Sequence, residues 1–316
     1  MGEGLRIVFY GADDFGVPSL KALSEKYAVV LVVTYKDLPG RRNQGRHPTP
    51  IKVVARELGL PVCEVSREEL RSNNIIEKIK DLHPDLGVVI SFAVLPEEIV
   101  SIPVLGTINL HPSILPSYRG PAPINWAIIK GETRTGITTF VLGKQVDAGD
   151  IILQEEVEIM PEENAGELRR RLAELGVPVL LKSIELLRSP GFKPIPQPHN
   201  LASRAPKILA IHRKINWHDK AINISNLIRG LAPTPGAVTI FRDMLVKVLK
   251  ASTEKNEILV GQPGEILGLS KDKDGLLVAT GNGTIVVKEL QPEGKKIMQA
   301  RDFWNGYKIQ KNELFQ

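Results

Sequence analysis

Residues 106–150 read GTINLHPSILPSYRGPAPINWAIIKGETRTGITTFVLGKQVDAGD. This stretch contains two apolar runs, a long loop between them and a turn after the second run. The runs at 106–110 and 137–142 have the length and composition of buried strands. The loop between them is rich in Pro and Gly and too long for a simple connection, which favours a binding loop. Ligands in open α/β sheets bind at the carboxyl ends of the strands, so this stretch predicts both the fold and the site.

Three polar side chains lie where these strands end. Asn109 and His111 close the first strand, and Asp147 follows the second in a turn of small and acidic residues. An Asn amide can donate to a developing oxyanion, a His can carry a proton, and an Asp can orient or charge that His. No candidate covalent nucleophile accompanies them. The alternative is structural, because a His at a strand end is often a capping or core residue.

Strands and helices alternate through the first half of the chain. Apolar runs predict strands at 5–10, 29–34, 61–65, 85–92 and 151–159, and the segments between them predict helices that include 50–58 and 67–82. The run at 85–92, DLGVVISF, is apolar throughout, as in a parallel strand buried on both faces. We therefore expect a doubly wound, mostly parallel α/β domain of Rossmann-like type.

The pattern changes after a Pro-rich segment at 190–206. One helix is predicted at 218–231, and five short strands follow at 237–241, 245–251, 264–269, 276–280 and 284–290. Gly281-Asn282-Gly283 is a strong hairpin signal between the last two. Five short strands predict a small β-barrel of OB type. The domains expected are thus 1–189, a linker at 190–206, and 207–316.

Composition narrows the class of protein. The chain has 316 residues, 42% hydrophobic and 24% charged, as in an ordinary globular protein. No apolar run approaches the roughly 18 residues of a membrane span, and no cleavable signal precedes the first strand. We expect a cytoplasmic protein without membrane contact. The single cysteine, Cys63, and six scattered histidines have no metal-ligand spacing, so no metal is expected.

Positive charge is concentrated in the C-terminal part. Residues 207–316 carry 17 Lys and Arg against 11 Asp and Glu, whereas the first 206 residues carry 24 against 25. The segment after the second predicted strand adds Arg41, Arg42 and Arg46. A barrel of OB type with such a surplus favours a polyanionic partner, although diffuse surface lysine is also common in soluble proteins.

Longer motifs carry a resemblance to a known family. The string N-x-H-x-S-x-L-P-x-Y-R-G-x-A-P at 109–123, followed by D-A-G-D at 147–150, resembles the formyltransferases that use 10-formyltetrahydrofolate. In the C-terminal half, APK at 205–207, IRGLAPTPGA at 228–237 and LQPEGKKIMQARDF at 290–303 are similar to the tail domain of those members that act on methionyl-tRNA. The similarity spans nearly the whole chain.

The resemblance implies an activity and a set of site residues. It implies transfer of a formyl group from 10-formyltetrahydrofolate to the amino group of methionyl-initiator-tRNA, with Asn109, His111 and Asp147 as catalytic residues. It implies a folate site lined by Phe92, Ala93, Val94, Leu95, Ser113, Ile114, Leu115 and Pro116. It implies tRNA contacts from Arg41, Arg42, Lys207, Lys247, Lys250, Lys295 and Lys296, and a chain that acts as a monomer without a metal.

Two alternatives remain open at this point. INWAIIKGETRTG at 124–136 also resembles formyltransferases of nucleotide-linked amino sugars, and Ser117 and the segment 91–96 depart from the pattern of the tRNA enzymes. The ELQPEGKK tail and the localised charge favour tRNA. A folate- or RNA-binding module without turnover is the third possibility, and it would leave Asn109, His111 and Asp147 without a role.

Overall fold

The structure of the chain is a computed structural model, which describes residues 4–37, 47–254 and 261–316. It divides into two compact units. The first unit comprises Met1–Gly120, Gly136–Val157 and Arg169–Arg204, and the second comprises Pro121–Thr135, Glu158–Leu168 and Ala205–Gln316.

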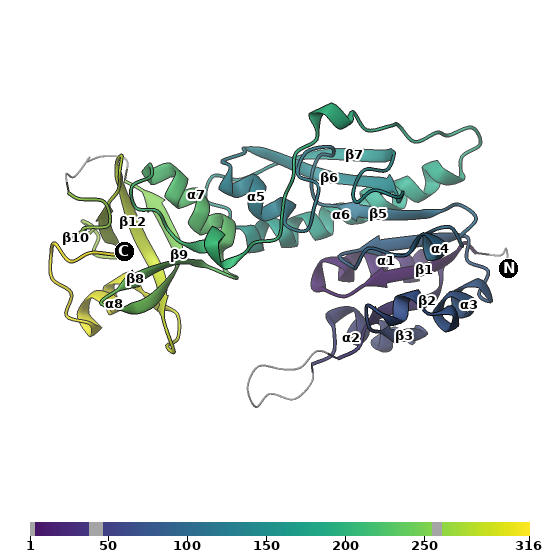
Figure 1. Cartoon of the computed structure of the whole chain (residues 1–316), viewed down its shortest axis with the longest axis horizontal. Helices are drawn as coiled ribbons and strands as arrows, with labels where there is room; N and C mark the ends of the chain where they lie inside the picture. Colours follow the sequence, from purple (N-terminus) through teal and green to yellow (C-terminus); the bar gives the residue numbers. More distant parts are fainter. Residues whose placement is uncertain (1–3, 38–46, 255–260) are drawn as a thin grey trace. The chain divides into compact units, whose positions relative to one another are not determined.

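A seven-stranded sheet forms the centre of the first unit, as Figure 1 shows. Its order is β3-β2-β1-β4-β5-β6-β7, and the pairings from β3 to β5 are parallel. Strand β6, in contrast, runs antiparallel to its neighbour β5. The strands are β1 (Arg6–Gly11), β2 (Ala28–Tyr35), β3 (Val62–Val65), β4 (Leu86–Ile90), β5 (Thr107–His111), β6 (Arg134–Val141) and β7 (Ile151–Glu158). The predicted Rossmann-like, mostly parallel fold is confirmed.

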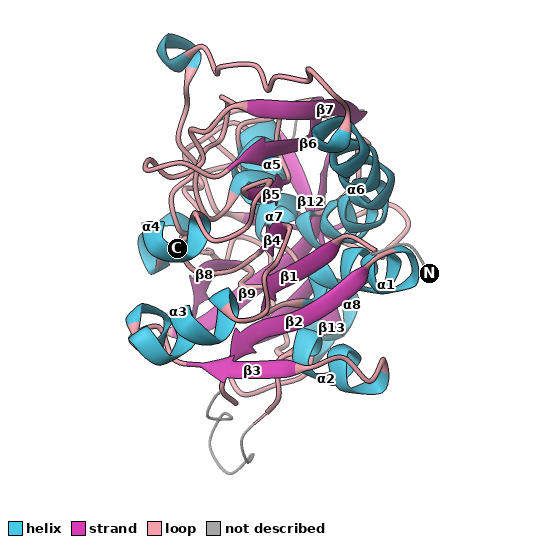
Figure 2. Cartoon of the chain, turned by 90° about the vertical axis from the view of Figure 1, so that its right-hand side faces the viewer, coloured by secondary structure: helices cyan, strands magenta, loops and turns pink. Residues whose placement is uncertain are grey.

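Helices cover both faces of this sheet. Helices α1 (Val17–Lys26) and α6 (Ala165–Arg188) lie on one side, and α3 (Asn73–Lys80) and α4 (Glu97–Val100) lie on the other (Figure 2). Helix α2 (Pro50–Glu57) packs beside α1 and β2. Strand β4 is buried along its whole length, as its unbroken apolar run predicted.

The prediction of one helix over 67–82 is wrong for the first third of that segment. Residues 69–71 form a 3-10 turn, and Ser72 then adopts an extended ψ of 141° before α3 begins at Asn73. The carboxylate of Glu69 accepts from the N–H of Ser66 (2.7 Å), and the Ser66 hydroxyl caps Glu69 (3.3 Å). Side chains that satisfy main-chain donors locally compete with a continuous helix in this way.

The second unit is built on an antiparallel sheet with the order β10-β11-β12-β9-β8, and β13 pairs with β12. Its strands are β8 (Ala237–Phe241), β9 (Met244–Thr253), β10 (Ile266–Leu269), β11 (Leu276–Ala279), β12 (Thr284–Pro292) and β13 (Met298–Gln299). Gly283 has a φ of +92° in the turn between β11 and β12, which fits the predicted hairpin. Helices α7 (Ala221–Leu231) and α8 (Ala300–Gly306) pack against β9 and β12 of this sheet, respectively.

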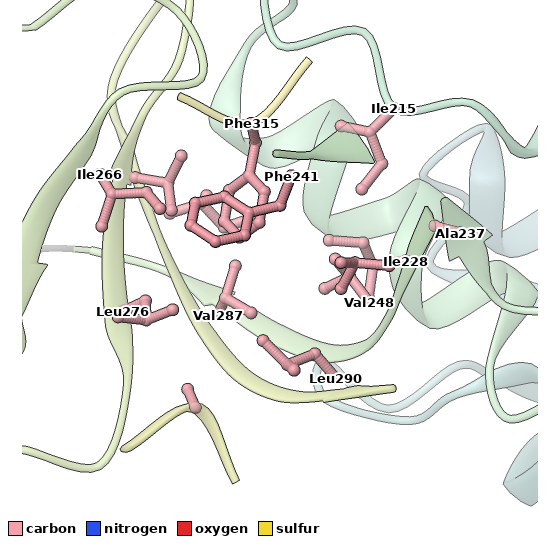
Figure 3. Close-up of a cluster of buried hydrophobic side chains, with 14 of the residues drawn as sticks. Ile215, Ile228, Ala237, Phe241, Val248, Ile266, Leu276, Val287, Leu290 and Phe315 are labelled. Atoms are coloured by element: carbon pink, nitrogen blue, oxygen red, sulfur yellow. The ribbon is translucent and has the colours of Figure 1, made fainter. Parts of the chain in front are cut away.

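The last residues of the chain join the two edges of this sheet. The N–H of Ile266 in β10 donates to the carbonyl of Glu313 (2.8 Å), and Gln316 and Ile240 of β8 exchange two main-chain hydrogen bonds (2.9 Å each). Phe315, 2% exposed, enters the apolar core together with Phe241, as Figure 3 shows. The C-terminal segment therefore closes the sheet and covers edges that would otherwise be open.

Besides α4 and α8, a third helix was not predicted. Helix α5 (Pro123–Ile129) lies inside the Pro-rich loop and packs against α7. The Asn125 amide donates to the carbonyl of Gly230 (2.7 Å), and a Cβ at Gly230 would stand 2.6 Å from the Ile129 side chain. A glycine at 230 therefore permits the close approach of the two helices.

Among the residues described, no helix has the length and apolar character needed to cross a membrane.

Candidate active site

Strand β5 carries two of the three predicted catalytic residues. Asn109 and His111 are two positions apart, so their side chains lie on the same face of the sheet. Asn109 pairs with Val89 of β4 on one side and with Phe140 of β6 on the other. The Phe140 ring also meets the His111 ring edge-on, with centroids 6.4 Å apart. Both side chains thus rest on the rigid centre of the sheet.

Asp147 reaches the site through the turn that follows β6. Because β6 is antiparallel to β5, its last residue, Val141, lies opposite Ile108 and not opposite His111. The turn after β6 runs back and brings Asp147 to the site with a φ of +52°. Gly149 permits this return, because a Cβ there would stand 1.7 Å from the carbonyl oxygen of Val141.

The His111 ring is held through one nitrogen and faces a carboxylate with the other. Nε2 lies 3.0 Å from the carbonyl oxygen of Tyr118, and Nδ1 lies 3.9 Å from Oδ2 of Asp147. Oδ2 in turn accepts from the main-chain N–H of Gly120 (2.8 Å). His111 is 5% exposed and Asp147 9%, so the pair is shielded from bulk solvent. The roles of Tyr118 and Gly120 were not predictable from residue type, because both act through the main chain.

Burial controls the charge of this ring. Removal from water lowers the pKa of His111, while the Asp147 charge and the hydrogen bond to the Tyr118 carbonyl raise it to a smaller extent. The ring is therefore neutral at pH 7 in the free protein. A carbonyl can only accept, so the proton of the neutral ring is on Nε2. Nδ1 is then the unprotonated nitrogen, and it faces Asp147.

The side chain of Asn109 has no hydrogen-bond partner among the described residues. Its Oδ1 is buried and unpaired, and neither end of its amide bonds to any residue that the structure describes. Buried polar groups without a partner are rare in folded proteins and often mark a site that binds or reacts. The amide is thus available to a ligand.

The two predicted folate-binding segments follow the neighbouring strands β4 and β5. In 92–95, no main-chain group hydrogen-bonds to another described residue. Val94 is 73% exposed, Leu95 is buried, Ala93 is half-buried, and Phe92 stacks on Tyr35 with ring centroids 4.6 Å apart. This segment offers an apolar edge with free main-chain donors and acceptors.

The second segment, 113–116, differs from the first because its polar groups are largely occupied. The Ser113 hydroxyl donates to the Ser117 carbonyl (2.7 Å), and the Leu115 N–H donates to the Thr138 hydroxyl (3.1 Å). Ser113 and Leu115 are buried, whereas Ile114 and Pro116 are half-buried. Ile114 and Pro116 therefore present the accessible surface of this segment.

The basic residues predicted for tRNA belong mainly to the second unit. Lys247 and Lys250 lie on β9 opposite Gln291 and Glu289 of β12, while Val246 and Val248 of β9 enter the core. Lys295 and Lys296 are exposed in the turn after β12, and the Gln291 amide donates to the Lys295 carbonyl (2.9 Å). Lys247 and Lys295 are thus brought to one end of β12.

Three other residues were predicted to contact tRNA. Lys207 is exposed at the start of the second unit's C-terminal portion. Arg41 and Arg42 lie outside the described residues. Within the described ranges, no group of three or more His, Cys, Asp or Glu side chains is arranged to hold a metal ion.

Two family models match this sequence. The model described as formyl transferase matches residues 5–184, and the model described as formyl transferase, C-terminal domain, matches residues 207–308. Both units of the structure therefore contain matched sequence.

Relatives match over almost the full length. The sequence is 41% identical to the methionyl-tRNA formyltransferase of Thermodesulfovibrio yellowstonii over 307 residues, which cover 96% of each chain. It is 41% identical to the methionyl-tRNA formyltransferase of Alkaliphilus oremlandii over 312 residues, 98% of this chain and 99% of the relative.

Solved structures share the fold at lower identity. HypX from Aquifex aeolicus in complex with tetrahydrofolic acid superposes with a TM-score of 0.65 and 20% identity, over 99% of this chain and 51% of HypX. The sugar 3N-formyl transferase WlaRD superposes with a TM-score of 0.65 and 18% identity, over 93% of this chain and 100% of WlaRD. At these identities the likeness concerns the fold alone.

Proposed function

The chain belongs to the methionyl-tRNA formyltransferase family, and from that premise we propose that Asn109, His111 and Asp147 are its catalytic residues. The reaction is formyl transfer from 10-formyltetrahydrofolate to the amino group of methionyl-initiator-tRNA. One observation carries the residue assignment. A buried His–Asp pair and an unpaired Asn amide lie together where strand β5 ends.

His111 acts as the proton carrier in this proposal. The attacking amine must lose a proton when its nitrogen bonds to the formyl carbon, and the unprotonated Nδ1 of the neutral ring accepts it. The Asp147 carboxylate, 3.9 Å away, stabilises the cationic ring that results. Nδ1 then returns the proton to N10 as the bond between N10 and the formyl carbon breaks. His111 ends in its starting state.

Asn109 has the electrostatic role. Negative charge develops on the formyl oxygen as the amine bonds to the carbon, and an amide N–H without another partner can donate to it. A donor already in place on the sheet needs little rearrangement during the reaction. The cationic His111 ring adds positive charge beside the same centre.

The segments 92–95 and 113–116 fit a bound folate. The formyl donor supplies an activated one-carbon group on N10. A flat heterocycle needs an apolar surface together with hydrogen-bond donors and acceptors. In 92–95 the apolar side chains beside the stacked Phe92 ring provide the surface, and the free main-chain groups provide the donors and acceptors. Ile114 and Pro116 would supply the opposing apolar contacts.

The second unit is assigned to the tRNA. Its charge surplus and the lysines at 247, 250, 295 and 296 support contacts with phosphates, and Lys207 extends this set. We assign catalysis to residues 1–189, a connecting role to 190–206 and tRNA binding to 207–316. The proposal also places the protein in the cytoplasm, where the charged initiator tRNA is, as a monomer.

A parallel assay tests the acceptor. The full-length protein and 10-formyltetrahydrofolate are offered methionyl-initiator-tRNA in one reaction and a nucleotide-linked 3-amino sugar in the other. The proposal requires formylation of the tRNA-bound methionine at a kcat/KM at least about 10³-fold above that for the sugar. Preference for the sugar, or turnover of neither, would contradict it.

A further inference from the structure

Gln197 is a buried side chain outside the proposed catalytic set. It is 4% exposed, and its Nε2 donates to the carbonyl oxygens of Asp147 (3.1 Å) and Gly149 (2.7 Å). Both carbonyls belong to the turn that carries the catalytic carboxylate. Asp147 adopts a φ of +52°, a conformation that side-chain-bearing residues keep only when their surroundings hold it. One amide that binds two carbonyls of the turn provides such support.

Arg119 fixes the orientation of Gln197. The guanidinium donates to Oε1 of Gln197 through Nε (3.1 Å) and through Nη2. Because arginine only donates and the two turn carbonyls only accept, the Gln197 amide can be placed in one way only. The next residue, Gly120, donates its N–H to Oδ2 of Asp147 (2.8 Å). Asp147 is thereby held at its carbonyl by Gln197 and at its carboxylate by Gly120.

The segment around Gln197 is itself fixed to the first unit. Ile195 and Ile151 exchange two main-chain hydrogen bonds (2.7 and 2.8 Å), and the N–H of Arg119 donates to the carbonyl of Ser203 (2.9 Å). These contacts lie on either side of Gln197 in the sequence. Its position is therefore set by the sheet and by the loop after β5.

We propose that Gln197 is a positioning residue for formyl transfer, which keeps the Asp147 carboxylate at its working distance from His111. This inference rests on the proposed function. It extends the catalytic machinery into the segment that follows α6, about 50 residues beyond Asp147 in sequence. Loss of the Gln197 amide would leave two turn carbonyls without their donor and would let the carboxylate move away from the ring.

Replacement of Gln197 by Met tests the inference, because Met has a similar length and no donor. We expect the single-turnover rate of methionyl-tRNA formylation to fall about 10- to 100-fold, with KM for both substrates little changed. The Asp147 charge raises the pKa of His111, so the NMR titration midpoint of His111 should also move to lower pH. The same direction is expected for Asp147→Asn.

Gln145→Met is the matched control. Gln145 lies in the same turn, its side chain is exposed, and it makes no side-chain hydrogen bond with a described residue. Its replacement should leave both the rate and the His111 midpoint unchanged. If Gln197→Met fails to fold, Gln197→Glu serves instead, because it keeps the acceptor for Arg119 and loses the donor to the turn.

The outcomes separate this inference from the proposed function. An unchanged rate in the Gln197 variant overturns the inference, and so does a lowered rate with an unmoved His111 midpoint, which would indicate a structural role only. A wild-type rate in Asp147→Asn would instead overturn the proposed function, whatever the Gln197 variant does.

Discussion

The carboxylate of Asp147 lies 3.9 Å from Nδ1 of His111, while Nε2 of the same ring is bonded to the carbonyl of Tyr118. A separation of 3.9 Å is beyond a direct hydrogen bond. Asp147 therefore acts on the neutral ring mainly through its charge. Because Nε2 is occupied, Nδ1 is the ring nitrogen left to accept a proton, as the proposed mechanism requires.

Asn109→Ala should separate catalysis from stability. The amide makes no hydrogen bond with a described residue, so its removal should change the free energy of unfolding by no more than about 1 kcal/mol. Loss of an oxyanion donor should lower kcat by about 10²- to 10³-fold. Urea unfolding and single-turnover formylation measure the two quantities. A kcat within threefold of the wild type would remove Asn109 from the mechanism.

His111 should contribute a pH-dependent term to stability. Its pKa in the folded protein lies below the ordinary 6.5, so the unfolded chain binds this proton more readily. The contribution of neutral His111 to the free energy of unfolding is complete above pH 6.5. It is lost as the pH falls from 6.5 toward the pKa of His111 in the folded protein.

Urea unfolding of the wild type and His111→Gln between pH 4.5 and 8 measures this contribution as a difference, which cancels the other ionisable groups. The wild type should lose more stability than the variant on going from pH 7 to pH 5. Parallel curves would show that the His111 pKa is not lowered.

The basic residues of the second unit should act by neutralising phosphates. Replacing Lys247 and Lys295 by Gln should weaken tRNA binding and reduce the slope of log K against log salt by about 1 for each lysine that pairs with a phosphate. The control is Lys21→Gln with Lys78→Gln, which removes the same charge from exposed sites of the first unit. An equal weakening of tRNA binding in the two double variants would mean that total charge matters and position does not.

The Phe315 side chain of the C-terminal segment should contribute strongly to the stability of the second unit. Phe315 is 2% exposed and stacks on Trp217 with ring centroids 5.5 Å apart. Phe315→Ala should lower the free energy of unfolding by about 3–5 kcal/mol. Gln316→Ala is the control, since Gln316 bonds to Ile240 through its main chain. A change below about 1 kcal/mol for Phe315→Ala in urea unfolding would contradict this packing.

Much of the fold was predictable because periodicity and apolar runs report on burial. The run at 85–92 indicated a central parallel strand, and β4 is buried throughout. Helix α5 was missed because Pro and Gly dominate its surroundings, although Ile124, Ala127 and Ile128 have helical spacing and Pro123 is tolerated in a first turn. A search for that spacing would have found it.

The site was predictable only in part. Asn109, His111 and Asp147 stood out by residue type and position, but the antiparallel direction of β6 relative to β5 was not predicted. Tyr118 and Gly120 act through main-chain atoms, and Gln197 binds the turn across 50 positions. Such contacts depend on the folded path of the chain and leave no local pattern in the sequence.

The most direct test of the mechanism compares two acidic residues of one turn. Asp147 is buried beside His111, whereas Asp150 is exposed. Single-turnover formylation of methionyl-tRNA should fall about 100-fold or more in Asp147→Asn and should stay within about twofold of the wild type in Asp150→Asn. An Asp147→Asn rate close to the wild type, with both proteins folded, would contradict the proposed pairing of His111 with Asp147 in catalysis.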